Sequence, residues 1–287
     1  MSYRRRASPL HAARAGVAAA YCLSLGAASL LLSAPLALGA TALAIVLAGV
    51  AAGVGRELLR AARFAVVLGL AVMIVNALVV RDGLTVILRL GDLPVLGQTD
   101  VTLEATAYGA ILGLRAVALI LCGALYTAAV DPDEILRVFR RVSFRSALTA
   151  TIGTRMVPIL IRDSHRLADA QRCRPGRPPS RAALMRAATA GLLDRALDVA
   201  AALEVRGYGG ARRPARVSRP YSRHDLAFGA AAIAILGLSI VGRAAGLEPF
   251  HAYPILYAPL AAPEWALAAA LLAAALLPFA ERRGIDR

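Results

Sequence analysis

The chain has 287 residues, of which 59% are apolar and 18% charged, and its formal net charge is +15 from 33 basic against 18 acidic residues. Soluble domains contain about 45–50% apolar residues, so this excess, gathered into runs of about twenty, predicts an integral membrane protein. All 33 basic residues are arginine, and a chain without lysine has neither a Walker A ATPase loop nor a Schiff-base lysine.

Six apolar segments have the length of membrane helices, about 16–23 residues each against the ~20 needed to cross the hydrocarbon layer. They are 15–32, 35–53, 64–80, 107–129, 226–241 and 264–279. Only Ser33 and Ala34 separate the first two, which predicts a tight helical hairpin. The predicted fold class is therefore an all-α integral membrane protein with about six transmembrane helices.

The charges between these segments predict the orientation of the chain, because arginine is enriched in cytoplasmic loops. Arginines occupy positions 4, 5, 6 and 14, and three more lie in the linker before residue 64. The segment 81–106 has two arginines against four acidic residues and is expected outside. The segment 131–223 has 19 arginines against 8 acidic residues. Six helices with both termini in the cytoplasm satisfy this distribution, and we expect a multi-pass protein of the plasma membrane.

The chain is thus expected to divide into three parts. Residues 1–130 would hold the first four membrane helices, 131–223 a cytoplasmic arm, and 224–287 the last two helices and a tail. Asp131 is a predicted N-cap followed by Pro132, and a short helix should run to about Arg141.

Two longer helices are predicted in the arm, each about 40 Å long. The first covers 144–173, carries Pro158 as an expected kink, and ends at the breaker 175–179. The second covers about 180–206, and Gly207 is its expected stop. Its apolar positions predict one buried stripe made of Met185, Ala188, Leu192, Ala196, Val199 and Leu203.

Arg174 and Arg206 each lie at the last turn of one of these helices, 32 positions apart. Local capping explains such arginines, because the helix dipole favours a cation there by about 0.3–1 kcal/mol. Alternatively, two guanidinium groups at helix ends would suit acidic or carbonyl-rich grooves on a partner protein.

A family resemblance appears at these residues. The run TAAVDPDEIL (127–136), the run RMVP (155–158), the run AQRCR (170–174) and the run ALEVRGY (202–208) occur in this order. Together they resemble the T component of energy-coupling factor transporters, the CbiQ-like family, over roughly residues 105–208. In the family the arm helices end in Ala-Arg-Gly, whereas this chain has Cys173-Arg174-Pro175 and Val205-Arg206-Gly207.

The resemblance implies a non-catalytic membrane scaffold without a cofactor. Its partners would be two cytoplasmic ABC-type ATPase subunits and a membrane-embedded substrate-binding S component, for uptake of a vitamin, a vitamin precursor or a transition-metal ion. The triplets at 173–175 and 205–207 would dock the ATPases, which hydrolyse the ATP. Arg155 and Pro158 would set the geometry of the arm.

Two polar residues lie inside predicted membrane helices. Arg115 carries an insertion cost of about 2.5–3.5 kcal/mol near a helix centre, so it either extends its side chain to the interface or makes a polar contact, with Asn76 or Glu104 as candidates. Asn76 is expected to make an interhelical hydrogen bond. Gly109 and Gly113 form a GxxxG face that permits close helix packing.

Other kinds of site are not supported by the sequence. Cys22, Cys122 and Cys173 include no CxxC pair, the four histidines are scattered, and neither a metal site nor a catalytic residue is expected. The basic arm would also bind anionic lipid, whereas no nucleic-acid-binding module is present. The alternative to a scaffold is a self-sufficient carrier or channel with a lipid-binding basic region; a membrane enzyme would need an acid–base or nucleophile set.

Overall fold

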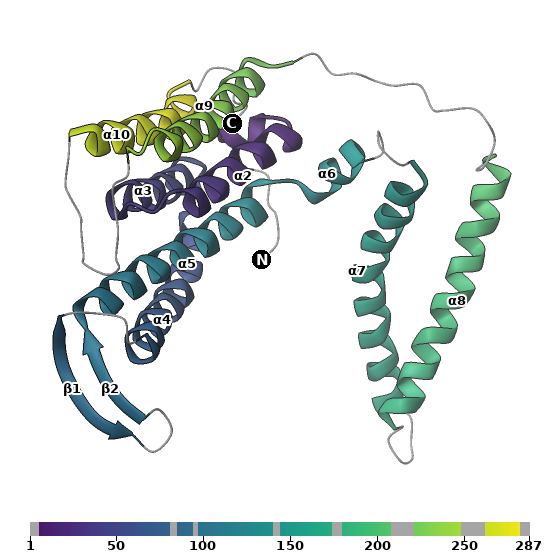
Figure 1. The fold of residues 1–287 in the computed structure, drawn as a ribbon. Helices are drawn as coiled ribbons and strands as arrows, with labels where there is room; N and C mark the ends of the chain where they lie inside the picture. The colour runs from purple at the N-terminus through teal and green to yellow at the C-terminus, as the bar shows by residue number, and fades with distance from the viewer. Residues whose placement is uncertain are drawn as a thin grey trace. The chain divides into compact units, whose positions relative to one another are not determined.

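We describe a computed structural model of the chain over residues 6–80, 85–93, 97–139, 144–173, 180–207, 221–247 and 262–281. The chain divides into two compact units. One combines Met1–Ile135 with Tyr221–Arg287 and is called the bundle unit, and the other, Leu136–Pro220, is called the arm unit. The arm unit is therefore an insertion with two covalent junctions to the bundle unit (Figure 1).

The bundle unit contains a helix for each of the six predicted apolar segments. After the short α1 (Pro9–Ala12) come α2 (Ala15–Leu31), α3 (Pro35–Ala51), α4 (Gly55–Val79), α5 (Leu103–Ala129), α9 (Arg223–Ala244) and α10 (Ala262–Leu276), which η1 (Leu277–Phe279) extends. Among the described residues, four stretches are long and apolar enough to cross a membrane, namely α4, α5, α9 and Ala262–Phe279, while α2 and α3 are shorter, at 17 residues each. The predicted all-helical membrane fold is confirmed.

One boundary differs clearly from the expectation. The third membrane helix was expected to begin at Phe64, but α4 already begins at Gly55 and includes Arg56, Arg60 and Arg63. Hydropathy finds the apolar part of a helix and misses polar turns that continue beyond it. At 1.5 Å per residue the 25 residues of α4 span about 37 Å, more than the ~30 Å of hydrocarbon.

The core of the bundle unit is built from small side chains and one aromatic cluster. Tyr21 of α2 and Phe228 of α9 are fully buried, and each packs edge-to-face on the other and on Phe279 of η1, at centroid separations of 5.1–6.2 Å. The Tyr21 hydroxyl donates to the Ala275 carbonyl oxygen at 2.8 Å. The cluster therefore joins the first, fifth and sixth apolar segments.

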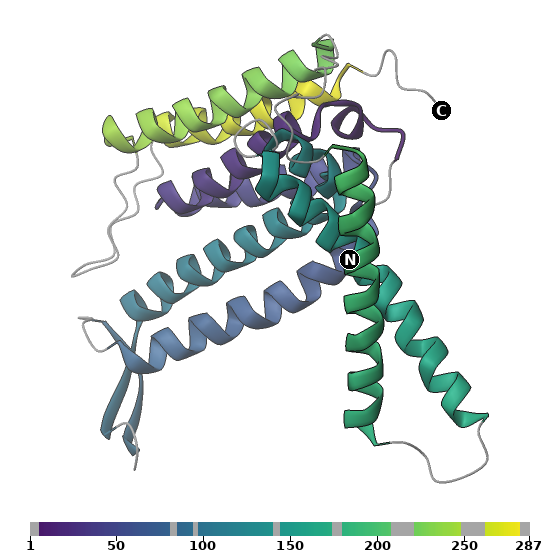
Figure 2. The same cartoon turned by 90° about the vertical axis from the view of Figure 1, so that its right-hand side faces the viewer.

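Helices α4 and α5 lie side by side in both views (Figures 1 and 2). Glycines face each other across this pair: a Cβ atom on Gly109 would lie 2.9 Å from the Met73 carbonyl oxygen, and one on Gly69 would lie 3.0 Å from the Gly113 carbonyl oxygen. The GxxxG face at Gly109 and Gly113 is thus used for close backbone approach.

Between α4 and α5 the structure contains an antiparallel hairpin that the sequence analysis missed, formed by β1 (Val86–Leu93) and β2 (Gly97–Thr102). Register irregularities interrupt the pairing after Val86 and after Arg89, so no clean alternation is visible in the sequence. The buried carboxylate of Glu104 holds the base of the hairpin, accepting from the Thr85 hydroxyl at 2.8 Å and from the Thr85 main-chain N–H at 3.3 Å.

In the arm region, α6 covers Pro132–Phe139, α7 covers Phe144–Arg172 and α8 covers Arg181–Val205. Asp131 accepts from the Asp133 N–H at 2.9 Å, which confirms the predicted cap. Residue Arg141, the expected end of the short helix, lies outside the described residues. The long helix α7 continues across Pro158, and the expected kink at this proline stays a prediction.

Helices α7 and α8 form an antiparallel pair connected at the 173–180 end (Figures 1 and 2). Half-buried side chains line the facing sides: Ile152, Met156, Ile159, Leu160 and Leu167 of α7, and Leu184, Ala188, Leu192, Val199 and Leu203 of α8. Two members of the predicted stripe, Met185 and Ala196, are exposed instead. Met185 follows Leu184 and Ala196 follows Arg195, and both of these preceding residues face α7. One position along a helix turns the side chain by about 100°, which moves Met185 and Ala196 off the facing side.

Candidate functional site

The end of α8 presents the second predicted triplet to solvent. Val205 is 90% exposed, and Arg206 and Gly207 are also exposed. Arg206 is the C-cap residue, and its N–H donates to the Ala202 carbonyl at 3.2 Å. Gly207 follows in the left-handed region, at φ +71°, and its N–H donates to the Glu204 carbonyl at 2.8 Å. The backbone thus fixes the position of Arg206 while its side chain stays available.

The first predicted triplet is described only at its first residue. Cys173 is exposed at the end of α7, and its N–H donates to the Asp169 carbonyl at 3.2 Å. Arg174 and Pro175 lie outside the described residues. Because α7 and α8 are antiparallel, Cys173 and Arg206 are at opposite ends of the pair, separated by the length of α8, about 37 Å for its 25 residues. The two triplets therefore do not form one site.

An ion pair joins the two long arm helices. Arg195 Nη1 of α8 lies 2.6 Å from Asp163 Oδ2 of α7, and both side chains are about 40% exposed (43% and 38%). An ion pair this exposed contributes about 0–1 kcal/mol. The half-buried apolar residues on either side of it carry more of the contact between α7 and α8.

The residues predicted to set the arm geometry lie on the first half of α7. Arg155 and Pro158 are both exposed, one turn apart. The Pro158 carbonyl accepts from Arg162 Nε at 3.4 Å.

Arg115 has a different partner from those expected. Its Nη2 atom donates to the Leu32 carbonyl oxygen at 2.9 Å, so neither Asn76 nor Glu104 is its partner. Arg243, near the end of α9, donates from Nη1 to the Leu31 carbonyl oxygen, also at 2.9 Å. The two guanidinium groups thus donate to the carbonyls at the end of α2. The 17 residues of α2 span only about 25 Å, so without these donors its last carbonyls would be unpaired within the hydrocarbon.

Asn76 also departs from the expectation of an interhelical hydrogen bond. Among the described residues its buried Oδ1 atom has no hydrogen-bond partner. Its Cβ atom would lie 3.1 Å from a Cβ on Gly109, so Asn76 packs at the close crossing of α4 and α5.

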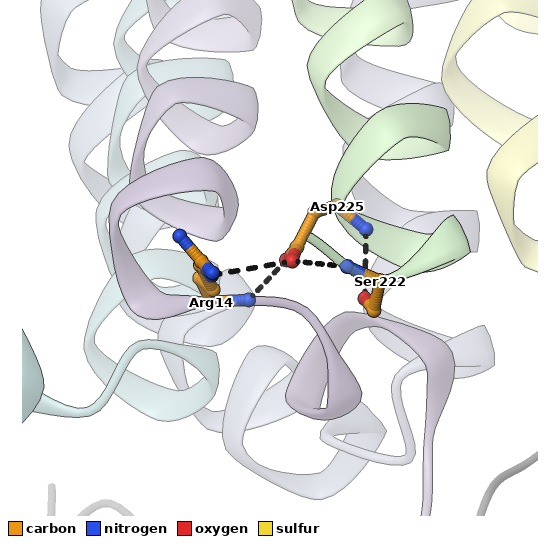
Figure 3. Close-up of polar contacts among 3 residues, drawn as sticks. All are labelled: Arg14, Ser222 and Asp225. Atoms are coloured by element: carbon orange, nitrogen blue, oxygen red, sulfur yellow. Dashed lines mark hydrogen bonds and ion pairs between the residues drawn. The ribbon is translucent and has the colours of Figure 1, made fainter. Parts of the chain in front are cut away.

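Sequence reasoning missed a polar network at the start of α9 (Figure 3). The Asp225 carboxylate accepts from the main-chain N–H of Arg14 at 2.7 Å and from that of Ser222 at 2.9 Å, and lies 3.4 Å from Arg14 Nε. The Ser222 hydroxyl accepts from the Asp225 N–H at 3.2 Å, which completes a capping box. The Ser-x-x-Asp spacing at 222–225 predicts such a cap, but not its partner Arg14.

The remaining functional groups form no reactive cluster in the part of the chain that the structure describes. No group of three His, Cys, Asp or Glu side chains there could hold a metal ion. Cys22 and Cys122 are buried free thiols and Cys173 is an exposed one.

Comparison with known proteins extends these observations. A search of curated proteins gives no match. A family model described as "CbiQ: Cobalt transport protein" matches residues 6–216, most of the chain, from the N-terminal segment through the end of α8. Members of this family are membrane components, generally non-catalytic, of cobalt and energy-coupling factor transport systems. The chain is therefore a multi-pass membrane protein that belongs to the CbiQ family, the T components of energy-coupling factor transporters.

Proposed function

We propose that this chain is the coupling subunit of an ATP-driven importer. In this proposal it joins two cytoplasmic ABC-type ATPase subunits, identical or different, to a membrane-embedded S component that captures a vitamin, a vitamin precursor or a transition-metal ion. The observation that carries the proposal is the exposed Arg206 at a backbone-fixed helix end, about 37 Å along the arm from Cys173. Two ends this far apart suit two separate ATPase subunits.

The docking residues would be Cys173, Arg174 and Pro175 at one end, and Val205, Arg206 and Gly207 at the other. A guanidinium offers several donors in a planar fork, which suits a groove lined by carboxylate or carbonyl oxygens. Arg155 and Pro158 would set the angle of the arm. ATP hydrolysis would take place in the partner subunits.

The proposed orientation places the arm and both chain termini in the cytoplasm, in the plasma membrane. Exposed arginines of the arm, such as Arg162, Arg166 and Arg186, would then also attract anionic lipid, by about 1 kcal/mol each when close to the surface. We expect no nucleic-acid partner.

The test is capture of the candidate ATPases by detergent-solubilised protein. Arg206→Glu and Arg174→Glu should each weaken capture, because truncating one side of a buried charged pair costs about 2–5 kcal/mol, roughly thirty-fold to several-thousand-fold in affinity. The double reversal should abolish it. Arg162→Glu is the matched control, since Arg162 is an exposed arginine in the middle of α7, about 15 Å along the arm from either triplet, and it should leave capture unchanged.

Size-exclusion profiles would show that each variant remains folded. Normal capture by the double variant would mean that the two arginines are only helix caps. Transport by the purified chain alone in vesicles would favour the self-sufficient carrier instead.

A further inference from the structure

The two junctions between the arm unit and the bundle unit are built differently. At the first junction Ile135 is partly buried against the apolar core of the bundle unit. At the second, Tyr221 is 70% exposed, and the Arg14 guanidinium carbon lies 4.2 Å from the centre of its ring. The returning chain is therefore held by a charged group of the N-terminal segment and by little apolar burial.

Immediately after Tyr221, one carboxylate caps two helices at once. Asp225 Oδ2 accepts from Ser222, the N-cap residue of α9, and Asp225 Oδ1 accepts from Arg14, the N-cap residue of α2. The Asp225 side chain is only 2% exposed. The positive ends of two helix dipoles and one guanidinium thus meet at a single buried anion (Figure 3).

The far ends of the same two helices are also joined. Arg243, in the last turn of α9, donates to the Leu31 carbonyl at the end of α2. Helices α2 and α9 therefore run in the same direction and are hydrogen-bonded to each other at both ends. The bonded residues are 211 positions apart in the sequence at the first end and 212 at the second.

We propose that Asp225 is a positioning residue that makes α2 and α9 move as one body when the arm is displaced. The proposal rests on the proposed function, in which nucleotide binding by the ATPases displaces the arm. Movement of the arm that is transmitted through the second junction first shifts Tyr221. Because Asp225 is bonded to the first residues of both α9 and α2, both helices then shift together. Without the carboxylate, the start of α9 would shift with the arm relative to the start of α2, while the Tyr21–Phe228 contact and the Arg243–Leu31 hydrogen bond still join the two helices further along.

The experiment measures the separation of α2 and α9 in the assembled complex with ATPases and S component. Spin labels at Leu23 and Leu226, exposed positions of α2 and α9, would be placed in a Cys173→Ala background, because the other two cysteines are buried. Distances would be recorded without nucleotide and with ATP and vanadate. In the parent protein the distance distribution should be the same in both states.

In Asp225→Asn the distribution should become nucleotide-dependent, because the amide retains the shape of the side chain but loses the charge and one acceptor. Uptake per ATP hydrolysed should fall at least about five-fold, the lower end of common coupling factors. A purely structural role would lower the amount of assembled complex and leave the distances independent of nucleotide. A nucleotide-independent distance in Asp225→Asn overturns the proposal.

Two further variants complete the test. Glu57→Gln removes the same kind of charge from a second ion pair among the described residues, that between Arg6 and Glu57 at the turn between α3 and α4, and this variant should behave as the parent. If Asp225→Asn does not assemble, the same distances are measured in Arg14→Lys, which keeps the main-chain contact and the charge but loses Nε. A nucleotide-independent distance in that variant would then overturn the proposal. Failure of the parent complex to capture ATPase would instead refute the proposed function.

Discussion

Gly69 of α4 and Gly113 of α5 bring two helix backbones into direct contact: a Cβ atom on Gly113 would lie 2.5 Å from the Gly69 carbonyl oxygen. A separation below 3 Å cannot be accommodated by turning a flexible side chain, because the opposing atom belongs to the backbone. Helices α4 and α5 must therefore separate if either glycine gains a side chain.

Gly113→Ala should lower the free energy of unfolding by about 1–3 kcal/mol, the usual cost of overpacking. The measurement is the thermal midpoint in detergent. Gly123→Ala on the same helix is the control, because a Cβ atom there meets nothing within 4 Å. Replacing a glycine in an open helical position with alanine gains about 0.5–1 kcal/mol, so the two variants should shift the midpoint in opposite directions.

The aromatic cluster makes a second prediction about stability. Phe228 is completely buried between Tyr21 and Phe279, so Phe228→Ala should cost about 3–5 kcal/mol. Phe64→Ala removes the same side chain from a position of α4 that is 66% exposed, and the change should be within about 0.5 kcal/mol. Equal losses in a detergent unfolding assay would contradict the packing described for α2, α9 and η1.

Gly207 makes a prediction about the end of the arm. Because its φ is +71°, Gly207→Ala should cost about 1–2 kcal/mol locally, and amide exchange in the last turn of α8 should accelerate about 5–30-fold. Gly191→Ala, in the middle of the same helix with nothing within 4 Å of the new Cβ, should slow exchange instead. Hydrogen exchange followed by mass spectrometry on the full chain would measure both. Unchanged exchange in Gly207→Ala would mean that the glycine does not fix Arg206.

The native cysteines provide a test of the proposed orientation. Cys173 is exposed, whereas Cys22 and Cys122 are buried in the membrane helices. A membrane-impermeant maleimide should therefore label the chain in inside-out vesicles and not in intact cells. Cys173→Ser should remove the label. Labelling of intact cells would place the arm outside and refute its contact with cytoplasmic ATPases.

The sequence by itself determined the features that depend on neighbouring residues. Apolar runs predicted six membrane-helix segments, and the cap at Asp131, the glycine stop at Gly207 and the position of Arg206 at a helix end follow from local chemistry. The motif order around residues 127–208 was sufficient to indicate the family, which the family match confirms.

Tertiary structure alone decided which distant groups meet. Periodicity gives a helix and its apolar face, but it does not say which backbone lies opposite, so the Leu32 carbonyl as partner of Arg115 and Gly69 as neighbour of Gly113 were not predictable. The irregular pairing of β1 with β2 likewise left no alternation to read. Asp225 shows the limit most clearly: its capping box is local, whereas its bond to Arg14, 211 positions away, exists only because two parallel helices begin at the same end of the bundle unit.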